Sequence, residues 1–351
     1  MIVNNDRIAW VDVLRFLGIW AIYIGHFGDK AGRAYPFVFS YHVPLFFFVA
    51  GFFSVRNLKD RPLVFIRKKT RQLMLPYVVF SLMALAVFTI QNDWDILQTK
   101  DVLMGFVLGI RDQIIAGSLW FIPCLYIIIL LDYFVRKLLK SQWAALAVSV
   151  GTFLISQTLL PHNPATDPSW FMNFDSALFF YIYFALGGIM FPIINKEPAT
   201  TLHWAAIGVL TVVGVTVTII TYFLTPYWFF GKIIGLIPFI QAFKLSIAVF
   251  NVLIALVIIY CNIVAAKFLA HISFLGELGR ETLVFCLSED VIKILITLLL
   301  AMVNLKVRLI NPFVTIVFSL ACLVVSKYTL VRFFNTYFPW ALGKPNLASS
   351  S

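Results

Sequence analysis

An arginine and a histidine lie eleven residues apart in the first hydrophobic segment of the chain. Every residue between Arg15 and His26 is aliphatic, aromatic or glycine. A charged group inside lipid costs a few kcal/mol or more, so both side chains need a polar interior to face. On a helix, this spacing puts the two side chains on nearly the same face, about 16 Å apart. Residues 8–28 are therefore expected to form a transmembrane helix that lines a polar path.

Two further groups extend this constellation. Asp12 precedes Arg15 by three residues, which is the spacing of an ion pair on one helical face. His42 lies near the start of the second hydrophobic segment, where it is expected to approach the membrane level of His26. An imidazole titrates near neutral pH, so it suits a general base that takes the proton of a sugar hydroxyl attacking a thioester. Alternatively, one or both histidines have a structural role, hydrogen-bonded to a neighbouring helix.

A second cluster is basic and lies just before the chain enters its next hydrophobic segment. Its sequence is Arg67-Lys68-Lys69-Thr70-Arg71, followed by Leu75-Pro76-Tyr77. Arg67 and Arg71 share a face if the segment is helical. Guanidinium groups bind phosphates in a bidentate way, so the pair could hold a nucleotide such as coenzyme A. The alternative is a topogenic signal that also anchors lipid headgroups.

Two carboxylates lie within the hydrophobic stretch 281–303. Glu289 and Asp290 are both at helical distance from Lys293, with which they could simply pair. Intramembrane carboxylates are nevertheless usually functional. Trp120, in Ser118-Leu119-Trp120-Phe121, opens another stretch, where an interfacial aromatic anchor is the plainer interpretation. Glu289 and Trp120 are kept as candidates for binding or orienting an acceptor.

The composition is that of a polytopic membrane protein. The chain has 351 residues, of which 61% are hydrophobic and 12% charged, and its mean hydropathy is +0.94. A soluble domain has about 25% charged residues. A membrane-spanning helix needs about 20 apolar residues. The chain is therefore predicted to be all-α, a bundle of about ten transmembrane helices. The predicted spans are residues 8–28, 36–55, 73–91, 118–135, 142–160, 174–194, 202–224, 243–263, 281–303 and 311–331. The apolar stretches 102–117 and 227–242 are too interrupted to be assigned as spans and could be re-entrant or interfacial. We expect one transmembrane domain over 1–346 and a polar C-terminal tail over 347–351.

Charge sets the expected orientation. The net charge of +11 reflects cytoplasmic lysine and arginine and attraction to anionic lipid, so it does not indicate nucleic-acid binding. The densest basic loop, between residues 56 and 71, is expected in the cytoplasm, which also places both termini there. The loop from Pro161 to Asn173 then lies outside. Trp170, Phe171 and Asn173 in this loop could stack on and hydrogen-bond a sugar, or anchor the loop at the interface.

Several classes of enzyme have no residues to support them. Cys124, Cys261, Cys286 and Cys322 all lie in hydrophobic stretches, with neither a disulfide framework nor a metal-ligand spacing. The sequence contains no GxSxG elbow, no P-loop and no HExxH motif. Hydrolase, ATPase and metalloenzyme functions are therefore not expected, and no metal site is predicted.

Taken in order, these motifs resemble the acyltransferase-3 family of integral membrane acyltransferases. The resemblance runs from about residue 7 to residue 335. At two places the chain differs from the family pattern, with Ala50 where serine is common and Glu289 where many relatives carry a histidine. The resemblance rests on Arg15-x10-His26, Tyr41-His42-Val43-Pro44-Leu45-Phe46-Phe47-Phe48, Arg67-x3-Arg71, Ser118-Leu119-Trp120-Phe121 and Leu278-Gly279-Arg280-Glu281-Thr282-Leu283.

The resemblance implies a multi-pass protein of the bacterial inner membrane that O-acetylates a cell-envelope or extracellular glycan. Acetyl-CoA would be the acyl-donor substrate, without any bound cofactor. The other partners would be a glycan or lipid-linked saccharide acceptor and membrane lipid. By this analogy His26 is the catalytic base, Asp12 and Arg15 line the passage, and Arg67 and Arg71 hold acetyl-CoA at the cytoplasmic face. The alternative function is a transporter or flippase that exports a polysaccharide or its lipid-linked precursor.

Overall fold

The computed structural model of the chain is built from helices joined by turns. It describes residues 7–196, 200–224, 244–302 and 311–344, and these residues contain no strand. The predicted interfacial piece 227–242 and the tail 347–351 lie outside the described residues. Among those described, six helical segments are long and apolar enough to cross a membrane: Ala34–Gly51, Pro62–Asn92, Phe171–Ile194, Trp204–Phe223, Leu245–Leu269 and Pro312–Tyr337.

Helical structure is present in each of the ten predicted ranges. The corresponding helices are α1 (Ala9–Gly25), α2 (Ala34–Phe39) with α3 (His42–Gly51), α5 (Leu75–Asn92), α7 (Phe121–Leu139), α8 (Gln142–Thr158), α9 (Phe174–Ile194), α10 (Thr201–Leu224), α13 (Lys244–Leu269), α15 (Thr282–Met302) and α16 (Pro312–Ser326). In lipid, a helix is the simplest structure that satisfies its own backbone groups. The number of membrane crossings and the side on which the termini lie stay predictions.

The remaining helices are shorter and connect or extend the long ones. Four are α-helices: α4 (Pro62–Lys69), α6 (Ile96–Leu108), α14 (Ser273–Arg280) and α17 (Arg332–Tyr337). Two are π segments, η3 (Thr70–Met74) and η6 (Lys327–Val331). The others are 3-10 turns: η1 (Gly28–Ala31), η2 (Ser54–Asn57), η4 (Arg111–Gln113), η5 (Phe171–Asn173) and η7 (Pro339–Leu342).

The helix α6 occupies part of a stretch that the sequence pattern left unassigned. Its first residue follows Asp95, whose carboxylate accepts the N–H of Gln98 at 2.8 Å. The side-chain oxygen of Gln98 accepts the N–H of Asp95 in return, at 3.1 Å. This capping box satisfies two backbone donors and fixes where α6 begins. The helix ends at Gly109, which adopts the left-handed conformation common at helix C-termini.

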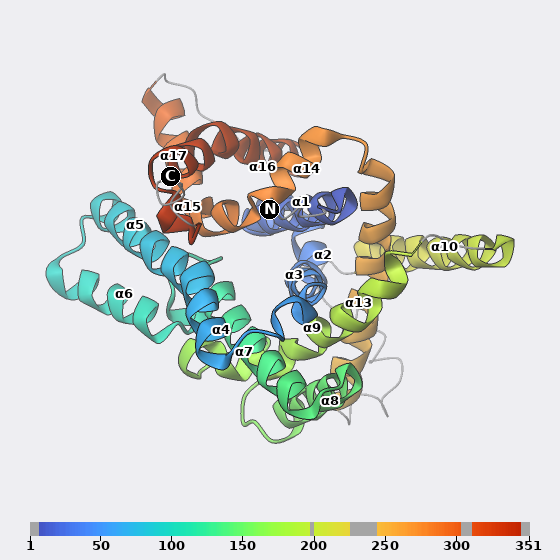
Figure 1. Cartoon of the computed structure of the whole chain (residues 1–351). Helices are drawn as coiled ribbons and strands as arrows, with labels where there is room; N and C mark the ends of the chain where they lie inside the picture. The colour runs from blue at the N-terminus through green and yellow to red at the C-terminus, as the bar shows by residue number, and fades with distance from the viewer. Residues whose placement is uncertain (1–6, 197–199, 225–243, 303–310, 345–351) are drawn as a thin grey trace, which may run out of the picture. The chain divides into compact units, whose positions relative to one another are not determined.

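The chain divides into two compact units, each assembled from segments far apart in the sequence. Unit 1 comprises Met1–Phe46, Glu197–Thr282 and Leu309–Val324, and unit 2 comprises Phe47–Lys196, Leu283–Arg308 and Val325–Ser351. In unit 1, α1 packs against α2, α13 and α14, and α10 packs against α13 (Figure 1). The Trp20 indole N–H donates to the Ser319 hydroxyl at 3.0 Å, which joins α1 to α16.

In unit 2, α7, α8 and α9 pack against one another, and the end of α3 crosses α9 very closely. A Cβ atom added at Gly51 would lie 2.0 Å from the carbonyl oxygen of Phe184. One added at Gly187 would lie 1.9 Å from the carbonyl oxygen of Phe48. Only glycine permits backbones to approach this closely, as at many helix crossings in membranes. The two glycines therefore set the distance between α3 and α9.

A buried ion pair lies in the second half of α7. The Nε of Arg136 is 2.8 Å from both carboxylate oxygens of Asp132, and the Tyr181 hydroxyl donates to the same carboxylate at 3.1 Å. Both charged side chains are about 2% exposed. The fourth predicted span, 118–135, ends just before Arg136. The structure instead continues the helix to Leu139 and buries this arginine against its partner four residues earlier.

Replacing Gly187 by alanine is expected to destabilise the protein, because the new methyl group overlaps the backbone of α3. We expect the free energy of unfolding to fall by about 1–3 kcal/mol, the usual cost of overpacking. The midpoint of thermal unfolding in detergent, followed by loss of the monodisperse peak in size-exclusion chromatography, measures the effect.

Gly151→Ala is the matched control. Gly151 lies inside α8, and nothing approaches within 4 Å of a Cβ atom built there. Alanine has the higher helix propensity, so this variant should be as stable as the parent or slightly more stable. Equal midpoints for the two variants would contradict the close crossing of α3 and α9.

Candidate active site

In unit 1, the helix α1 carries Asp12 and Arg15 and ends next to His26. Asp12 Oδ1 lies 3.5 Å from Arg15 Nη1, so the predicted ion pair forms. The helix is unbroken from Ala9 to Gly25, and the N–H of His26 bonds to the carbonyl oxygen of Ile22 at 3.0 Å. Arg15 and His26 are thus held by one rigid element, and the His26 side chain is half-buried.

A third charged group, which spacing along the first helix does not identify, joins this pair. Arg280 Nε lies 4.0 Å from Asp12 Oδ2, so Asp12 stands between two guanidinium groups. The contact depends on Gly279, since a Cβ atom there would lie 1.6 Å from the carbonyl oxygen of Asp12. Gly279 and Arg280 belong to one of the motifs that carry the family resemblance. Asp12, the partner of Arg280, is distant in sequence, so only the folded structure shows the contact.

The two candidate histidines of unit 1 are linked through Phe39. The ring centroids of His26 and Phe39 are 6.4 Å apart, and those of Phe39 and His42 are 4.8 Å apart in an edge-to-face arrangement. Phe39 also packs on Gly25, where a Cβ atom would lie 2.9 Å from its ring. One aromatic side chain therefore positions the end of α1 and the start of α3 relative to each other.

His42 is buried, with 2% of the residue exposed. Its Nδ1 lies 2.6 Å from the carbonyl oxygen of Val38. A carbonyl oxygen only accepts, so Nδ1 carries the proton and Nε2 is the acceptor atom of the neutral ring. This bond within one helical turn supports a structural role for His42 and at the same time fixes its tautomer.

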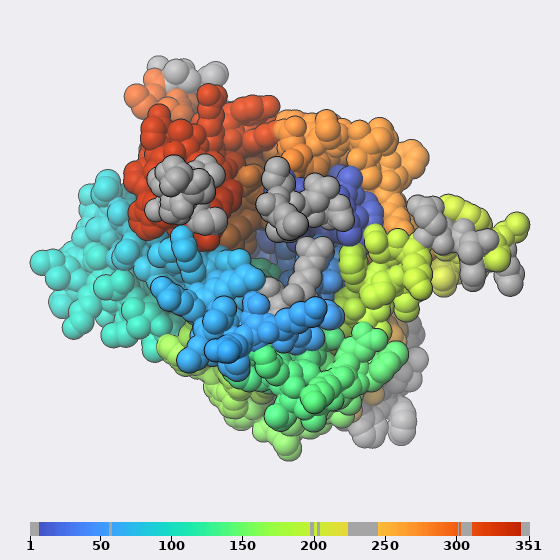
Figure 2. Space-filling model, viewed as in Figure 1, coloured from blue at the N-terminus to red at the C-terminus, as the bar shows by residue number. Residues whose placement is uncertain are grey.

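The predicted phosphate-binding arginines lie in unit 2, on a helical run that continues from α4 through η3 into α5. Arg67 and Arg71 are both exposed, and the blue residues of α4 lie on the surface seen in Figure 2. The run changes from α to π geometry at Thr70, between the two arginines. A π segment is rare, is common at functional sites, and alters the angle between side chains before and after it.

Contacts to α7 and to the C-terminal segment hold this helical run. The Thr70 hydroxyl lies 2.8 Å from that of Tyr126, and Arg71 Nη2 donates to the carbonyl oxygen of Lys344 at 3.3 Å. Gly343 has a φ of 66° and its Cα lies against Arg71, since a Cβ atom there would be 2.5 Å from the Arg71 carbonyl oxygen. The C-terminal segment therefore holds both the backbone and the guanidinium group of Arg71.

Glu289 is almost completely buried and forms two strong contacts. Ser118 donates its hydroxyl proton to Glu289 Oε2 at 2.5 Å, and Lys293 pairs with Glu289 Oε1. The pairing with Lys293 was expected from the helical spacing. Asp290 accepts the backbone N–H of Gly117 at 3.0 Å. The two acids of α15 therefore hold the segment that leads into α7.

Trp120 is buried, and the guanidinium of Arg111 lies 5.2 Å from the centre of its ring. The amide nitrogen of Asn173 donates to the carbonyl oxygens of Gly109 and Trp120, and its oxygen accepts the N–H of Arg111 at 3.0 Å. Trp120 therefore packs inside unit 2 and does not present an open aromatic face. Asn173, considered above for a sugar contact, is fully engaged in holding this loop.

The predicted residues divide between the units. Asp12, Arg15, His26 and His42 belong to unit 1, and Arg67, Arg71, Trp120 and Glu289 belong to unit 2. Within the part of the chain that the structure describes, no three His, Cys, Asp or Glu side chains gather to hold a metal ion.

A family model described as an acyltransferase domain matches residues 8–332, nearly the whole chain. No curated protein and no solved structure matches the chain. The match includes every candidate residue of both units, from Asp12 to Glu289.

The Glu289–Lys293 pair allows a test of its contribution to the fold. Lys293→Met leaves a buried carboxylate without its cation, so the free energy of unfolding is expected to fall by about 3–5 kcal/mol. The double variant Glu289→Gln/Lys293→Met removes both charges and should recover most of this loss. Unfolding in mixed micelles, followed by tryptophan fluorescence, measures the free energy for each variant.

Lys100→Met is the control for loss of a lysine. Lys100 is exposed on α6, so its replacement should change the free energy of unfolding by less than about 0.5 kcal/mol. If the double variant is as unstable as Lys293→Met alone, the unpaired charge of Glu289 is not the cause of the lost stability.

Proposed function

The chain belongs to the acyltransferase family whose model matches residues 8–332, and from this premise we propose that it is a membrane-embedded O-acetyltransferase. The acetyl group would pass from cytoplasmic acetyl-CoA to a hydroxyl of a cell-envelope or extracellular glycan at a bacterial inner membrane. The observation that carries the proposal is the match itself, because it covers nearly the whole chain and all of the candidate residues. Neither the match nor the contacts of the described residues favour the alternative of a polysaccharide exporter.

In this proposal His26 is the general base. Its imidazole takes the proton of the acceptor hydroxyl while the hydroxyl oxygen attacks the thioester carbonyl. The bond between the carbonyl carbon and sulfur breaks, CoA leaves as a thiolate, and the proton on the imidazole is available to neutralise it. The position of His26 supports this role, since the residue ends a rigid helix and is only half-buried.

Asp12, Arg15 and Arg280 are proposed to line the passage to His26. Two guanidinium groups around one carboxylate carry a net positive charge, which favours an anionic or strongly dipolar guest. The close packing of α14 on α1 at Gly279 supports this arrangement, because it holds Arg280 against Asp12.

Arg67 and Arg71 are proposed to bind the phosphates of acetyl-CoA. Both are exposed, and Arg71 is fixed by the C-terminal segment. His42 would support the base through the Phe39 contact. Glu289 and Trp120 would orient the acceptor indirectly, by holding the segment between Gly117 and α7.

His26→Gln is expected to reduce glycan acetylation by about 10²–10⁴-fold, because glutamine cannot take the proton. Acetate released by mild alkali from envelope material of cells that carry each variant measures the product. His271→Gln, at an exposed histidine of unit 1, is the control and should retain full acetylation. A normal acetate yield from correctly inserted His26→Gln would remove His26 from the mechanism.

Arg67→Lys and Arg71→Lys keep the positive charge but lose the planar fork that binds two phosphate oxygens. Each variant is expected to weaken acetyl-CoA binding by about tenfold, measured by titration calorimetry on purified protein. Arg61→Lys, in the same basic loop, is the control and should bind normally. If all three lysine variants bind acetyl-CoA like the parent, the arginines serve only as topogenic or lipid-anchoring charges.

A further inference from the structure

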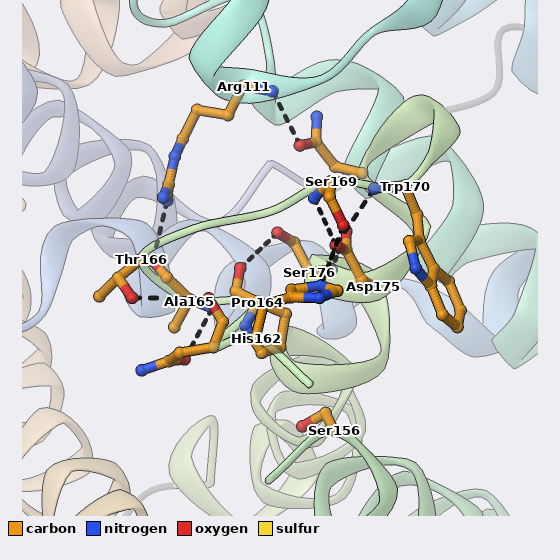
Figure 3. Close-up of polar contacts among 12 residues, drawn as sticks. Arg111, Ser156, His162, Pro164, Ala165, Thr166, Ser169, Trp170, Asp175 and Ser176 are labelled. Atoms are coloured by element: carbon orange, nitrogen blue, oxygen red, sulfur yellow. Dashed lines mark hydrogen bonds and ion pairs between the residues drawn. The ribbon is translucent and has the colours of Figure 1, made fainter. Parts of the chain in front are cut away.

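A histidine–carboxylate pair lies in unit 2, between α8 and α9, among residues that have no role in the mechanism above. His162 Nε2 lies 2.8 Å from Asp175 Oδ2 (Figure 3). Asp175 is completely buried and also accepts the backbone N–H groups of Ser169, Trp170 and Ser176, at 2.7, 3.2 and 2.8 Å. A carboxylate that accepts this many hydrogen bonds is held in one orientation.

These contacts determine which nitrogen of the His162 ring is available to a ligand. Because Asp175 accepts, Nε2 carries the donated proton, and in the neutral ring Nδ1 is the acceptor atom. The Ser169 hydroxyl also lies near Nε2, at 3.3 Å. Within the described residues, both polar contacts of the ring are therefore made by Nε2. The side chain is 15% exposed, so the ring is held in place and still reaches the surface.

A partly exposed aromatic side chain lies beside this imidazole. The rings of His162 and Trp170 are 6.5 Å apart between centroids, and the indole is drawn beside the His162–Asp175 pair in Figure 3. Trp170 is 41% exposed and stacks with Phe174 at 6.1 Å and an interplanar angle of 19°. The flat indole and the oriented acceptor thus lie next to each other on one short segment.

The backbone that carries Trp170 is strained and firmly held. Met172 and Asn173 have φ values of 54° and 53°, a left-handed conformation that costs about 1 kcal/mol or more for a residue with a side chain. The amide bonds of Asn173 and the bond from Arg111 Nη1 to the carbonyl oxygen of Ala165, at 2.9 Å, hold the loop in this shape. Such strain persists only where the surroundings enforce it, so the segment is organised before any ligand binds.

We propose that Trp170 and His162 form the sugar-binding site for the acceptor glycan. A pyranose ring would stack on the indole, and one of its hydroxyl groups would donate a hydrogen bond to Nδ1 of His162. This inference rests on the proposed function, which supplies a glycan as the acceptor, and on the loop being outside the membrane. A lipid anchor would require the exposed aromatic rings but not an imidazole oriented by a buried carboxylate. The mixed polar and aromatic surface therefore favours a saccharide.

The test measures binding of named saccharides to the purified full-length protein in detergent. Fluorescently labelled trisaccharides of glucose, of galactose and of N-acetylglucosamine are the probes, and fluorescence polarisation is the readout. We expect at least one probe to bind. His162→Gln retains an N–H that can donate to Asp175, but its acceptor is an amide oxygen on a flexible chain instead of Nδ1 of a rigid ring. Trp170→Ala removes the platform. Each variant should weaken binding by about tenfold.

Two controls separate the site from general effects. Trp143→Ala removes a tryptophan that is 63% exposed at the start of α8, and it should bind the probe like the parent. His162→Asn cannot reach Asp175 in the same way, so it should lower the midpoint of thermal unfolding as well as binding. His162→Gln should unfold at the parent midpoint, which shows that its loss of binding is local.

The outcomes distinguish this site from the proposed function. If no probe binds, or if Trp143→Ala weakens binding as much as Trp170→Ala, the sugar site is wrong. If His162→Gln and Trp170→Ala acetylate glycan normally in cells, the site is also wrong, while the acetyltransferase function stands. If the probe binds as expected but the parent protein transfers no acetyl group from acetyl-CoA, the site stands and the proposed function fails.

Discussion

Polar groups among apolar helices must find partners within the protein, and this constraint organises both units. Asp12 lies between Arg15 and Arg280 in unit 1, and Arg136 is held by Asp132 in unit 2. Glu289 accepts a hydrogen bond from the Ser118 hydroxyl and pairs with Lys293. Because an unpaired charge in an apolar setting is so costly, each contact fixes the helices that supply its members.

Glycines make several of these contacts possible. Gly279 lets the backbone of α14 touch α1, and Arg280 then reaches Asp12. In unit 2, Gly51 and Gly187 let α3 and α9 cross at backbone distance. Helices in lipid gain little from burying apolar surface against each other, so close packing and polar pairing provide much of the association. The small residues and the charged residues therefore act together.

His42 and His162 are oriented in different ways. His42 bonds to its own helical turn and is linked to His26 through Phe39, whereas His162 is oriented by a fully buried carboxylate in a strained loop. In both, a hydrogen bond at one ring nitrogen defines the chemical character of the other. The proposed sugar contact of His162 thus depends on Asp175, which orients the ring, as well as on the imidazole itself.

The sequence by itself determined the membrane class, the positions of the hydrophobic helices, the family and the pairs Asp12–Arg15 and Glu289–Lys293. These features depend on composition and on helical spacing within one segment, which a sequence displays directly. Only the tertiary structure decided that Arg280 joins Asp12, that Trp120 is covered by Arg111, and that Asp175 orients His162. Those contacts join segments that are distant in sequence, or they depend on the left-handed turn at Met172 and Asn173. The periodicity of apolar residues within one segment predicts neither long-range packing nor such a turn.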